Sequence, residues 1–292
     1  MKGWAPSIAV AVVLAAGCSG SDTSRETSGE RIVTLTAGLT EAVFALGAGD
    51  LVVARDISST IDEADALPIV TTAHDINVEA LLAVRPTLIL IDEDTGPETA
   101  LDQIEATGVR IELVDNATTV DDIIPRLERV AEILGLDDRA ARLSDAISAD
   151  LARIRSDESL AKVRIAFVYL RGPAGVYLIG GPGSGPDSII TAAGATDAGT
   201  AIGLDLAFTP LTPEAMVEAA PDVLLVTTTG LDSVDGIDGL VELAGVAQTP
   251  AGKARRVITA EDGLLFSFGP RTPSLIESLR QEIAAEMEKA VP

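Results

Sequence analysis

An internal duplication constrains the fold of this 292-residue chain more than any other feature of its sequence. Residues 78–91 read VEALLAVRPTLILI, and residues 213–226 read PEAMVEAAPDVLLV, at a constant offset of 135 positions. Each copy has the pattern of a short helix that ends near a proline and leads into a buried aliphatic strand. The continuations, residues 94–98 and 228–232, also correspond once one position is dropped. We therefore expect two similar α/β halves.

The remaining apolar segments complete two lobes around this repeated unit. In the first half, strand-like segments lie at residues 31–35, 51–55, 87–91 and 110–114, and a helix is expected at 40–46. The second half begins with a strand at 163–170 and ends with a helix near 273–289. Aliphatic strands that alternate with helices predict a mostly parallel sheet covered on both faces.

A long helical pattern separates the two halves. Residues 120–160 carry apolar side chains at three-and-four spacing, with a break at 135–138. The predicted fold is therefore α/β, with two similar Rossmann-like lobes joined by one long backbone helix and a ligand cleft between the lobes. The expected boundaries are 31–119 for the N-terminal lobe, 120–160 for the linker helix and 161–292 for the C-terminal lobe.

The first 30 residues predict export and a lipid anchor. Lys2 precedes a short apolar run at residues 8–14, which is followed by small residues and by Cys18, the only cysteine of the chain. This pattern is typical of a bacterial lipoprotein signal peptide, residues 1–17, cleaved before an acylated Cys18. The alternative is an uncleaved anchor. Residues 18–30 are polar and predict a flexible tether. We therefore expect the protein at the outer face of the cytoplasmic membrane.

The charge and the scarcity of reactive side chains exclude several functions. The net charge is −24, and it becomes −25 when Lys2 is removed with the signal peptide. Binding to nucleic acid needs a basic face, so we expect none. A single histidine and an acylated cysteine leave no histidine-rich metal site and no cysteine nucleophile. No enzyme activity is expected, although hydrolysis by carboxylates stays open on sequence alone.

Two lobes, a long linking helix and a lipid tether together resemble the helical-backbone (class III) substrate-binding proteins of ABC importers. Residues 35–47 and 85–88 resemble this class in general, whereas 72–79, 171–185 and 269–273 are similar to the haemin-binding lipoproteins of haem importers. The resemblance implies a monomeric protein that captures haem outside the cytoplasmic membrane and delivers it to a permease driven by a cytoplasmic ATPase. The alternative is a ferric-siderophore or cobalamin binding protein of the same fold.

The resemblance also implies that haem iron is held between a histidine and a tyrosine. His74, the only histidine, precedes the first duplicated helix, and Tyr177 follows the strand at 163–170 after a Gly-Pro loop. Both types of side chain are axial ligands of haem iron, so His74 and Tyr177 are the predicted pair. Tyr169 is interpreted as a packed strand residue. Some haem binders of this class carry a tyrosine near position 61, where this chain has Ile61.

Three arginines are candidates for supporting the ligand. Arg171 could stabilise a tyrosine phenolate or pair with a haem propionate, and Arg55 and Arg271 are further candidates for the propionates. The glycine-rich run at 180–185 could offer backbone N–H groups to an anion, although a plain turn is the simpler interpretation. The resemblance finally implies that one acidic residue on each lobe docks onto the permease, and Glu98 and Asp232 are the equivalent positions.

Overall fold

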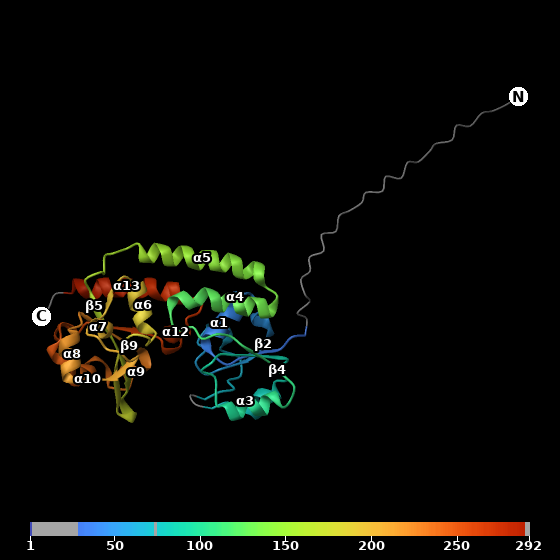
Figure 1. Ribbon diagram of the computed structural model, residues 1–292, viewed down its shortest axis with the longest axis horizontal. Coiled ribbons are helices and arrows are strands. Elements are labelled where there is room, and N and C mark those ends of the chain that lie inside the picture. The colour runs from blue at the N-terminus through green and yellow to red at the C-terminus, as the bar shows by residue number, and fades with distance from the viewer. Residues whose placement is uncertain (2–28, 73–74, 290–292) are drawn as a thin grey trace.

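The computed structural model describes Met1 and residues 29–72 and 75–289 (Figure 1). Cys18, nearly all of the predicted signal peptide and tether, and His74 lie outside the described residues. The described chain forms two α/β lobes placed side by side, with a layer of helices running along one side of both. No helix within the described ranges is long and apolar enough to cross a membrane.

The N-terminal lobe (N-lobe) is built on a four-stranded parallel sheet in the order β2-β1-β3-β4. Its strands are β1 (Ile32–Thr34), β2 (Val52–Arg55), β3 (Leu88–Ile91) and β4 (Arg110–Leu113). Its helices are α1 (Ala37–Ala45), α2 (Val78–Ala83) and α3 (Glu98–Glu105). Successive side chains of a strand point to opposite faces, so Leu88 and Leu90 join the core beneath α1, whereas Ile89 and Ile91 join the core beneath α2 and α3.

The C-terminal lobe (C-lobe) has a mixed six-stranded sheet in the order β10-β9-β5-β6-β8, and β7 pairs with β5. Its strands are β5 (Arg164–Arg171), β6 (Val176–Gly180), β7 (Thr196–Asp197), β8 (Phe208–Pro210), β9 (Val223–Thr227) and β10 (Val257–Ala260). Strands β5, β9 and β10 run parallel, whereas β6 and β8 are antiparallel additions. Its helices are α6 (Pro186–Ala192), α7 (Ala198–Ala201), α8 (Pro213–Ala219), α9 (Thr228–Asp232), α10 (Gly236–Glu242), α11 (Pro250–Ala254), α12 (Asp262–Ser267) and α13 (Thr272–Glu288).

The structure confirms the duplication. Helix α2 and strand β3 correspond to α8 and β9, and the parallel order β1-β3-β4 corresponds to β5-β9-β10. Asn77 and Thr212, 135 positions apart, each accept a hydrogen bond from the first turn of their helix, which satisfies an otherwise unpaired backbone N–H group. A second shared contact lies at the other end of the helix, where Arg31 donates to the carbonyl of Val84 and Arg164 to that of Ala219.

The linker differs from the expected single helix. It consists of α4 (Ile123–Leu134) and α5 (Asp137–Arg155), and Gly135 ends α4 in the left-handed conformation at φ 69°. A residue without a Cβ adopts that conformation at little cost, so the chain reverses there and α5 packs back against α4. Helix α4 contacts α1 of the N-lobe, and α5 contacts α6 and α13 of the C-lobe (Figure 1). The connection is therefore a two-helix brace.

The lobes also touch each other directly. The side chain of Arg271, at the start of α13, forms an ion pair with Glu41 of α1 at 2.8 Å, and the Glu41 side chain is only 3% exposed. At Gly38 a Cβ would overlap the carbonyl oxygen of Ser267, and at Gly263 it would overlap that of Ser58. Backbone from the two lobes meets at both places, so glycine is required there. These contacts hold the two lobes against each other beside the cleft.

Candidate ligand-binding cleft

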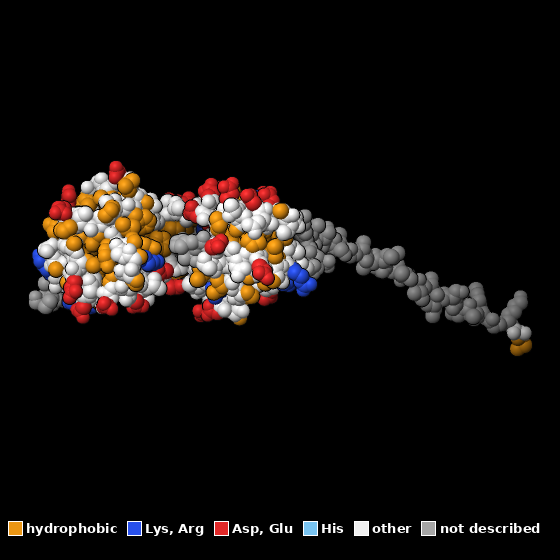
Figure 2. Space-filling model, turned by 90° about the horizontal axis from the view of Figure 1, so that it is seen from below, with side chains coloured by type: hydrophobic (Ala, Val, Ile, Leu, Met, Phe, Trp, Pro, Cys, Tyr) orange, Lys and Arg blue, Asp and Glu red, His pale blue; other side chains and the backbone are white. Residues whose placement is uncertain are grey.

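A cleft of about 1300 Å³ lies between the lobes. The N-lobe contributes the segments that follow β1, β2, β3 and β4, the C-lobe contributes β5, β6, β8, the start of α9 and α12, and α4 contributes Arg126. Ligands of open α/β sheets bind beyond the carboxyl ends of parallel strands, and the N-lobe strands end at this cleft. Seen from below, hydrophobic side chains gather on the C-lobe while acidic ones are spread over both lobes (Figure 2).

The C-lobe wall of the cleft is aromatic and aliphatic. Tyr169, Leu178, Phe208 and Phe266 line it. The rings of Tyr169 and Phe208 lie 5.8 Å apart at 61°, an edge-to-face arrangement that fixes both side chains. Since β6 pairs Leu178 with Tyr169, these two residues share one face of the sheet. The wall is therefore a preformed apolar surface with one phenol group in it.

Arg171 lies over the ring of Tyr169, with its guanidinium carbon 4.5 Å from the ring centroid. The guanidinium donates to the carbonyl of Leu170 at 2.8 Å and forms an ion pair with Asp262 at 3.3 Å. Asp262 in turn accepts a hydrogen bond from the Thr229 hydroxyl at 2.7 Å. All four side chains that make these contacts line the cleft. Arg171 is thus held over the ring of a tyrosine that lines the cleft, and this tyrosine is Tyr169 rather than the expected Tyr177.

Tyr177 does not reach the cleft, so the expectation that it projects there is wrong. Strand β6 pairs Tyr177 with Leu170, and both side chains lie on the opposite face of the sheet, where Leu170 is buried with Ala166 and Val168 and the partly buried Tyr177 packs against this cluster. The residues after 171 are expected to form a Gly-Pro loop, but the chain returns as β6. The alternation of side chains along β6 then places Tyr177 on the face away from the cleft. Tyr169, interpreted as a packed residue, is the tyrosine that lines the cleft.

The N-lobe wall is polar. Asp56 accepts hydrogen bonds from the hydroxyls of Ser58 and Ser59. The Ser59 hydroxyl is also hydrogen-bonded to the Thr40 hydroxyl, with 2.6 Å between the two oxygens. Farther along the chain, Thr72 donates its backbone N–H to the carbonyl of Asp75 at 2.7 Å. Thr72 and Asp75 both line the cleft, and they flank positions 73 and 74 in the sequence. This wall offers hydroxyl and carboxylate groups where the C-lobe wall offers rings.

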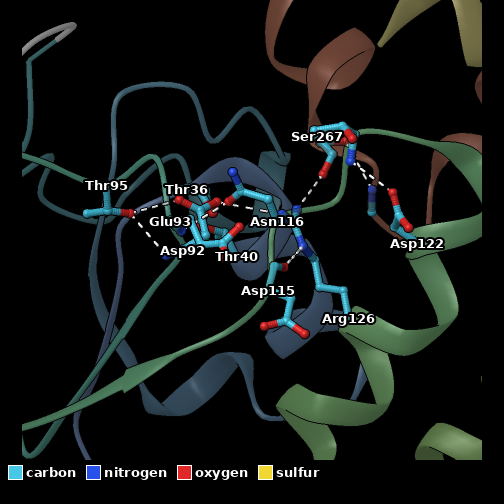
Figure 3. Close-up of polar contacts among 12 residues, drawn as sticks. Thr36, Thr40, Asp92, Glu93, Thr95, Asp115, Asn116, Asp122, Arg126 and Ser267 are labelled. Carbon is cyan, nitrogen blue, oxygen red and sulfur yellow. Dashed lines mark hydrogen bonds and ion pairs between the residues drawn. The ribbon is translucent and has the colours of Figure 1, made fainter. Parts of the chain in front are cut away.

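A buried ion pair lies where the two walls meet (Figure 3). Arg126 of α4 is 6% exposed, pairs with Asp92 at 3.6 Å and donates to the carbonyl of Ser267 in the C-lobe at 3.0 Å. Burial raises the pKa of Asp92, and hydrogen bonding by Thr95 and the charge of Arg126 oppose that rise. Burial likewise lowers the pKa of Arg126 against the charge of Asp92. Arg126 joins the N-lobe, the linker and the C-lobe at one point.

The sequence did not indicate Arg126 as a site residue, although one signal was present. The position falls on the apolar stripe of its helix, between Ile123 and Val130, both of which are buried. A charged residue on such a stripe must find a buried partner, and Asp92 directly follows a buried strand. Asp262 had no comparable signal, because its contact with Arg171 spans 91 positions.

Two of the predicted propionate-binding arginines are engaged away from the cleft. Arg55 is buried, donates to the carbonyls of Ala64 and Ser59, and does not line the cleft. Arg271 pairs with Glu41 at the contact between the lobes. Neither arginine therefore lies in the cleft, where it was expected. The loop after β2 wraps around Arg55, and Glu41 of α1 pairs with Arg271.

The two proposed docking acids are exposed, whereas backbone N–H groups of the glycine-rich run are already hydrogen-bonded within the protein. Glu98 is exposed at the first residue of α3, and Asp232 is exposed at the last residue of α9. Pro97, directly before α3, and Thr229, near the start of α9, line the cleft, so each helix borders it. In the glycine-rich run, the carboxylate of Asp187 accepts the backbone N–H groups of Gly183 and Gly185. The described residues contain no cluster of histidine, cysteine and carboxylates that would hold a bare metal ion.

Comparison with known proteins agrees with this architecture. A sequence profile for periplasmic binding proteins matches residues 32–263. The chain belongs to the periplasmic binding protein family. Among solved structures, the periplasmic heme-binding protein RhuT from Roseiflexus sp. RS-1 is 36% identical, with a TM-score of 0.83, covering 89% of this chain and 99% of RhuT. The heme-binding protein HmuT is 32% identical with a TM-score of 0.80, covering 87% of this chain and 84% of HmuT.

Two further proteins are similar in sequence to this chain. YvrC of Bacillus subtilis, an uncharacterised ABC transporter substrate-binding lipoprotein, is 24% identical over 273 residues, which is 91% of this chain and 83% of YvrC. The vitamin B12-binding protein of Yersinia pestis is 36% identical over 104 residues only, 35% of this chain and 37% of that protein.

Solved HmuT variants replace a histidine, a tyrosine, and an arginine two positions after that tyrosine. Tyr169 and Arg171 have the same two-residue spacing.

Proposed function

We propose that this protein is the haem-binding component of an ABC importer, and that it captures ferric haem in the cleft without chemical change. The observation that carries the proposal is the placement of Tyr169 on an apolar wall with Arg171 stacked on its ring. Tyrosine is an established ligand of haem iron through its oxygen. The similarity to RhuT and HmuT, which are named heme-binding proteins, supports the same ligand.

The C-lobe supplies the main grip on the ligand. Tyr169 coordinates the iron, and the guanidinium of Arg171 offsets the negative charge that a phenolate ligand carries. Leu178, Phe208 and Phe266 provide the apolar surface on which a flat macrocycle can lie. Burial of that surface contributes roughly 25 cal/mol per Å², so the wall adds affinity to the bond between iron and oxygen.

His74 is the proposed second iron ligand, from the N-lobe. Its support is its position in the sequence, between Thr72 and Asp75, which both line the cleft across from Tyr169. Neutral imidazole is a common axial ligand of haem. Replacement His74→Ala should shift the Soret band of the complex and lower haem affinity, and an unchanged spectrum would remove His74 from the site.

Delivery requires an anchor and a docking surface. The proposal places an acyl group on Cys18, which would hold the protein at the outer face of the cytoplasmic membrane, and YvrC is itself named a lipoprotein. Glu98 and Asp232, exposed beside the cleft on equivalent helices, are the proposed contacts to arginines of the permease. Cys18→Ala should release the protein from membranes. Glu98→Gln with Asp232→Asn should reduce haem uptake while leaving haem binding intact, and uptake at the parent rate would exclude these two docking positions.

A titration of the purified protein with haemin tests the ligand class. A saturable one-to-one shift of the Soret band is expected, with no comparable binding of cobalamin or of a ferric hydroxamate siderophore in calorimetry. Binding of cobalamin or the siderophore, without a shift of the Soret band of haemin, would overturn the proposal. The protein would then be a periplasmic binding protein with a ligand other than haem. Size-exclusion chromatography with light scattering in the same buffer checks the expected monomer.

A further inference from the structure

We infer that the cleft selects its ligand by charge, favouring iron porphyrins with few carboxylates, and that it binds haem with the propionates directed out to solvent. This inference rests on the proposed function. It concerns which members of one ligand class bind well and in which orientation they do so.

The described lining of the cleft is strongly acidic. Its carboxylates are Asp56, Asp75, Asp92, Asp94, Glu261 and Asp262, and its only cationic groups are Arg126 and Arg171. No lysine contributes to the lining within the described ranges. The acids come from both lobes, so a ligand in the cleft meets negative charge from two sides.

Both arginines are already neutralised by the protein. Arg126 pairs with Asp92 and donates to two backbone carbonyls, and Arg171 pairs with Asp262 and lies on Tyr169. Moving either guanidinium to a ligand carboxylate would leave a protein carboxylate without its partner. For Asp92 that would be costly, because the group is nearly buried, with a side chain 8% exposed.

The other four carboxylates form no ion pair within the described ranges. No ion pair of the described residues includes Asp56, Asp75, Asp94 or Glu261, and the last three are exposed. Asp56 is buried, but its two oxygens are satisfied by Ser58 and Ser59. Arg55 and Arg271, which could have balanced them, are engaged elsewhere. A carboxylate placed inside the cleft would therefore be repelled, whereas one that projects into solvent is hydrated and screened.

Binding constants for three ferric porphyrins test the inference, since the iron chemistry stays constant while the carboxylates change. The probes are iron(III) protoporphyrin IX dimethyl ester, iron(III) protoporphyrin IX and iron(III) coproporphyrin III, with none, two and four free carboxylates. At 20 mM salt we expect coproporphyrin to bind roughly tenfold more weakly than protoporphyrin, from Coulomb repulsion at about 10 Å. The diester should bind at least as tightly as protoporphyrin. At 500 mM salt the differences in affinity among the three porphyrins should become smaller.

A pair of variants assigns the effect to the cleft. Asp94→Asn with Glu261→Gln removes one acid from each lobe. This double variant should reduce the ratio of the protoporphyrin and coproporphyrin binding constants several-fold. The control, Asp102→Asn with Asp145→Asn, removes the same charge from exposed helix positions outside the cleft and should leave this ratio nearly unchanged. Equal affinity for all three porphyrins, or tighter binding with more carboxylates, would overturn charge selection. Failure of all three to bind would instead overturn the proposed function.

Discussion

Strands β1 and β5 are the first strands of the two lobes and occupy equivalent positions. Arg31, just before β1, and Arg164, at the start of β5, each donate a hydrogen bond to a carbonyl at the C-terminal end of the duplicated helix, α2 or α8. From there the lobes diverge. In the N-lobe the chain turns at once into α1, and Thr36, Ala37 and Gly38 face the cleft. In the C-lobe β5 continues to Arg171 and returns as β6.

This difference explains why the two walls of the cleft have different chemistry. The longer strand β5 carries Tyr169 and Arg171 to the ligand space, and the added strands β6 and β8 bring Leu178 and Phe208 beside them. The N-lobe, without this hairpin, presents hydroxyls and carboxylates. The duplicated helix–strand unit thus serves as the scaffold, and the proposed ligand contacts lie on the parts that the two lobes do not share.

The largest effect on stability is expected where Arg126 ties the lobes together. Arg126→Met leaves Asp92 buried without its cation and removes the bond to Ser267 in the C-lobe. Loss of one partner of a buried ion pair typically costs about 3–5 kcal/mol, measurable as the free energy of unfolding in urea. Adding Asp92→Asn should restore part of that loss. A single variant as stable as the parent would show that Arg126 does not hold the lobes together.

The glycine contact between the lobes gives the next largest effect. Gly38→Ala should lower the free energy of unfolding by about 1–3 kcal/mol, because a Cβ would overlap the Ser267 carbonyl and the Arg126 side chain. Alanine otherwise stabilises a helix by about 1 kcal/mol over glycine. A gain in stability would therefore mean that the lobes are farther apart than described.

The equivalent arginines sharpen the comparison between the lobes. Arg31→Ala removes the side-chain hydrogen bonds to the carbonyls of Val84 and Arg85, just after α2, and Arg164→Ala removes the one to Ala219, the last residue of α8. Each change should cost about 1–2 kcal/mol of unfolding free energy, as expected for charged donors at partly exposed sites. Thermal unfolding of the two variants checks this. A loss in only one of them would show that the duplicated units are held by different contacts.

The smallest effect concerns the point where the linker enters the C-lobe. Hydrogen bonds from Ser159 and the contact with Arg280 lower the pKa of Asp157 from 3.8 to about 2. A carboxyl with a lowered pKa stabilises the fold above its unfolded pKa, and this contribution disappears as the pH falls from about 4 towards 2. Asp157→Asn should therefore flatten the pH dependence of stability in that window. Asp145→Asn, on the exposed face of α5, should leave the slope unchanged.

The scaffold could be predicted from the sequence because local patterns determine it. The repeated helix–proline–strand segments were recognised, and so were the strands at β1, β2, β3, β4 and β5. The brace was predicted as one helix because the break at Gly135 shows where a helix ends but does not show that the chain reverses there. Patterns of this kind carry no information about how distant segments meet.

The site depended on such distant contacts. The face on which Tyr177 lies follows from the β5–β6 register, which the turn at Gly172–Ala174 sets. The engagement of Arg55 follows from how residues 56–65 fold around it. Arg171 was predicted as a supporting residue and lines the cleft, but its partners Tyr169 and Asp262 become apparent only once the strands are paired.

Resonance Raman spectra of the ferric haem complex test the central claim most directly. With excitation in the charge-transfer region, iron–phenolate vibrations report tyrosine ligation. We expect these bands in the parent protein and in Tyr177→Phe, and their loss in Tyr169→Phe. Haem binding by Tyr169→Phe should be roughly hundredfold weaker, because loss of the ligand itself should cost at least as much as loss of a group that orients a ligand. Loss of the bands in Tyr177→Phe, with retention in Tyr169→Phe, would contradict the account.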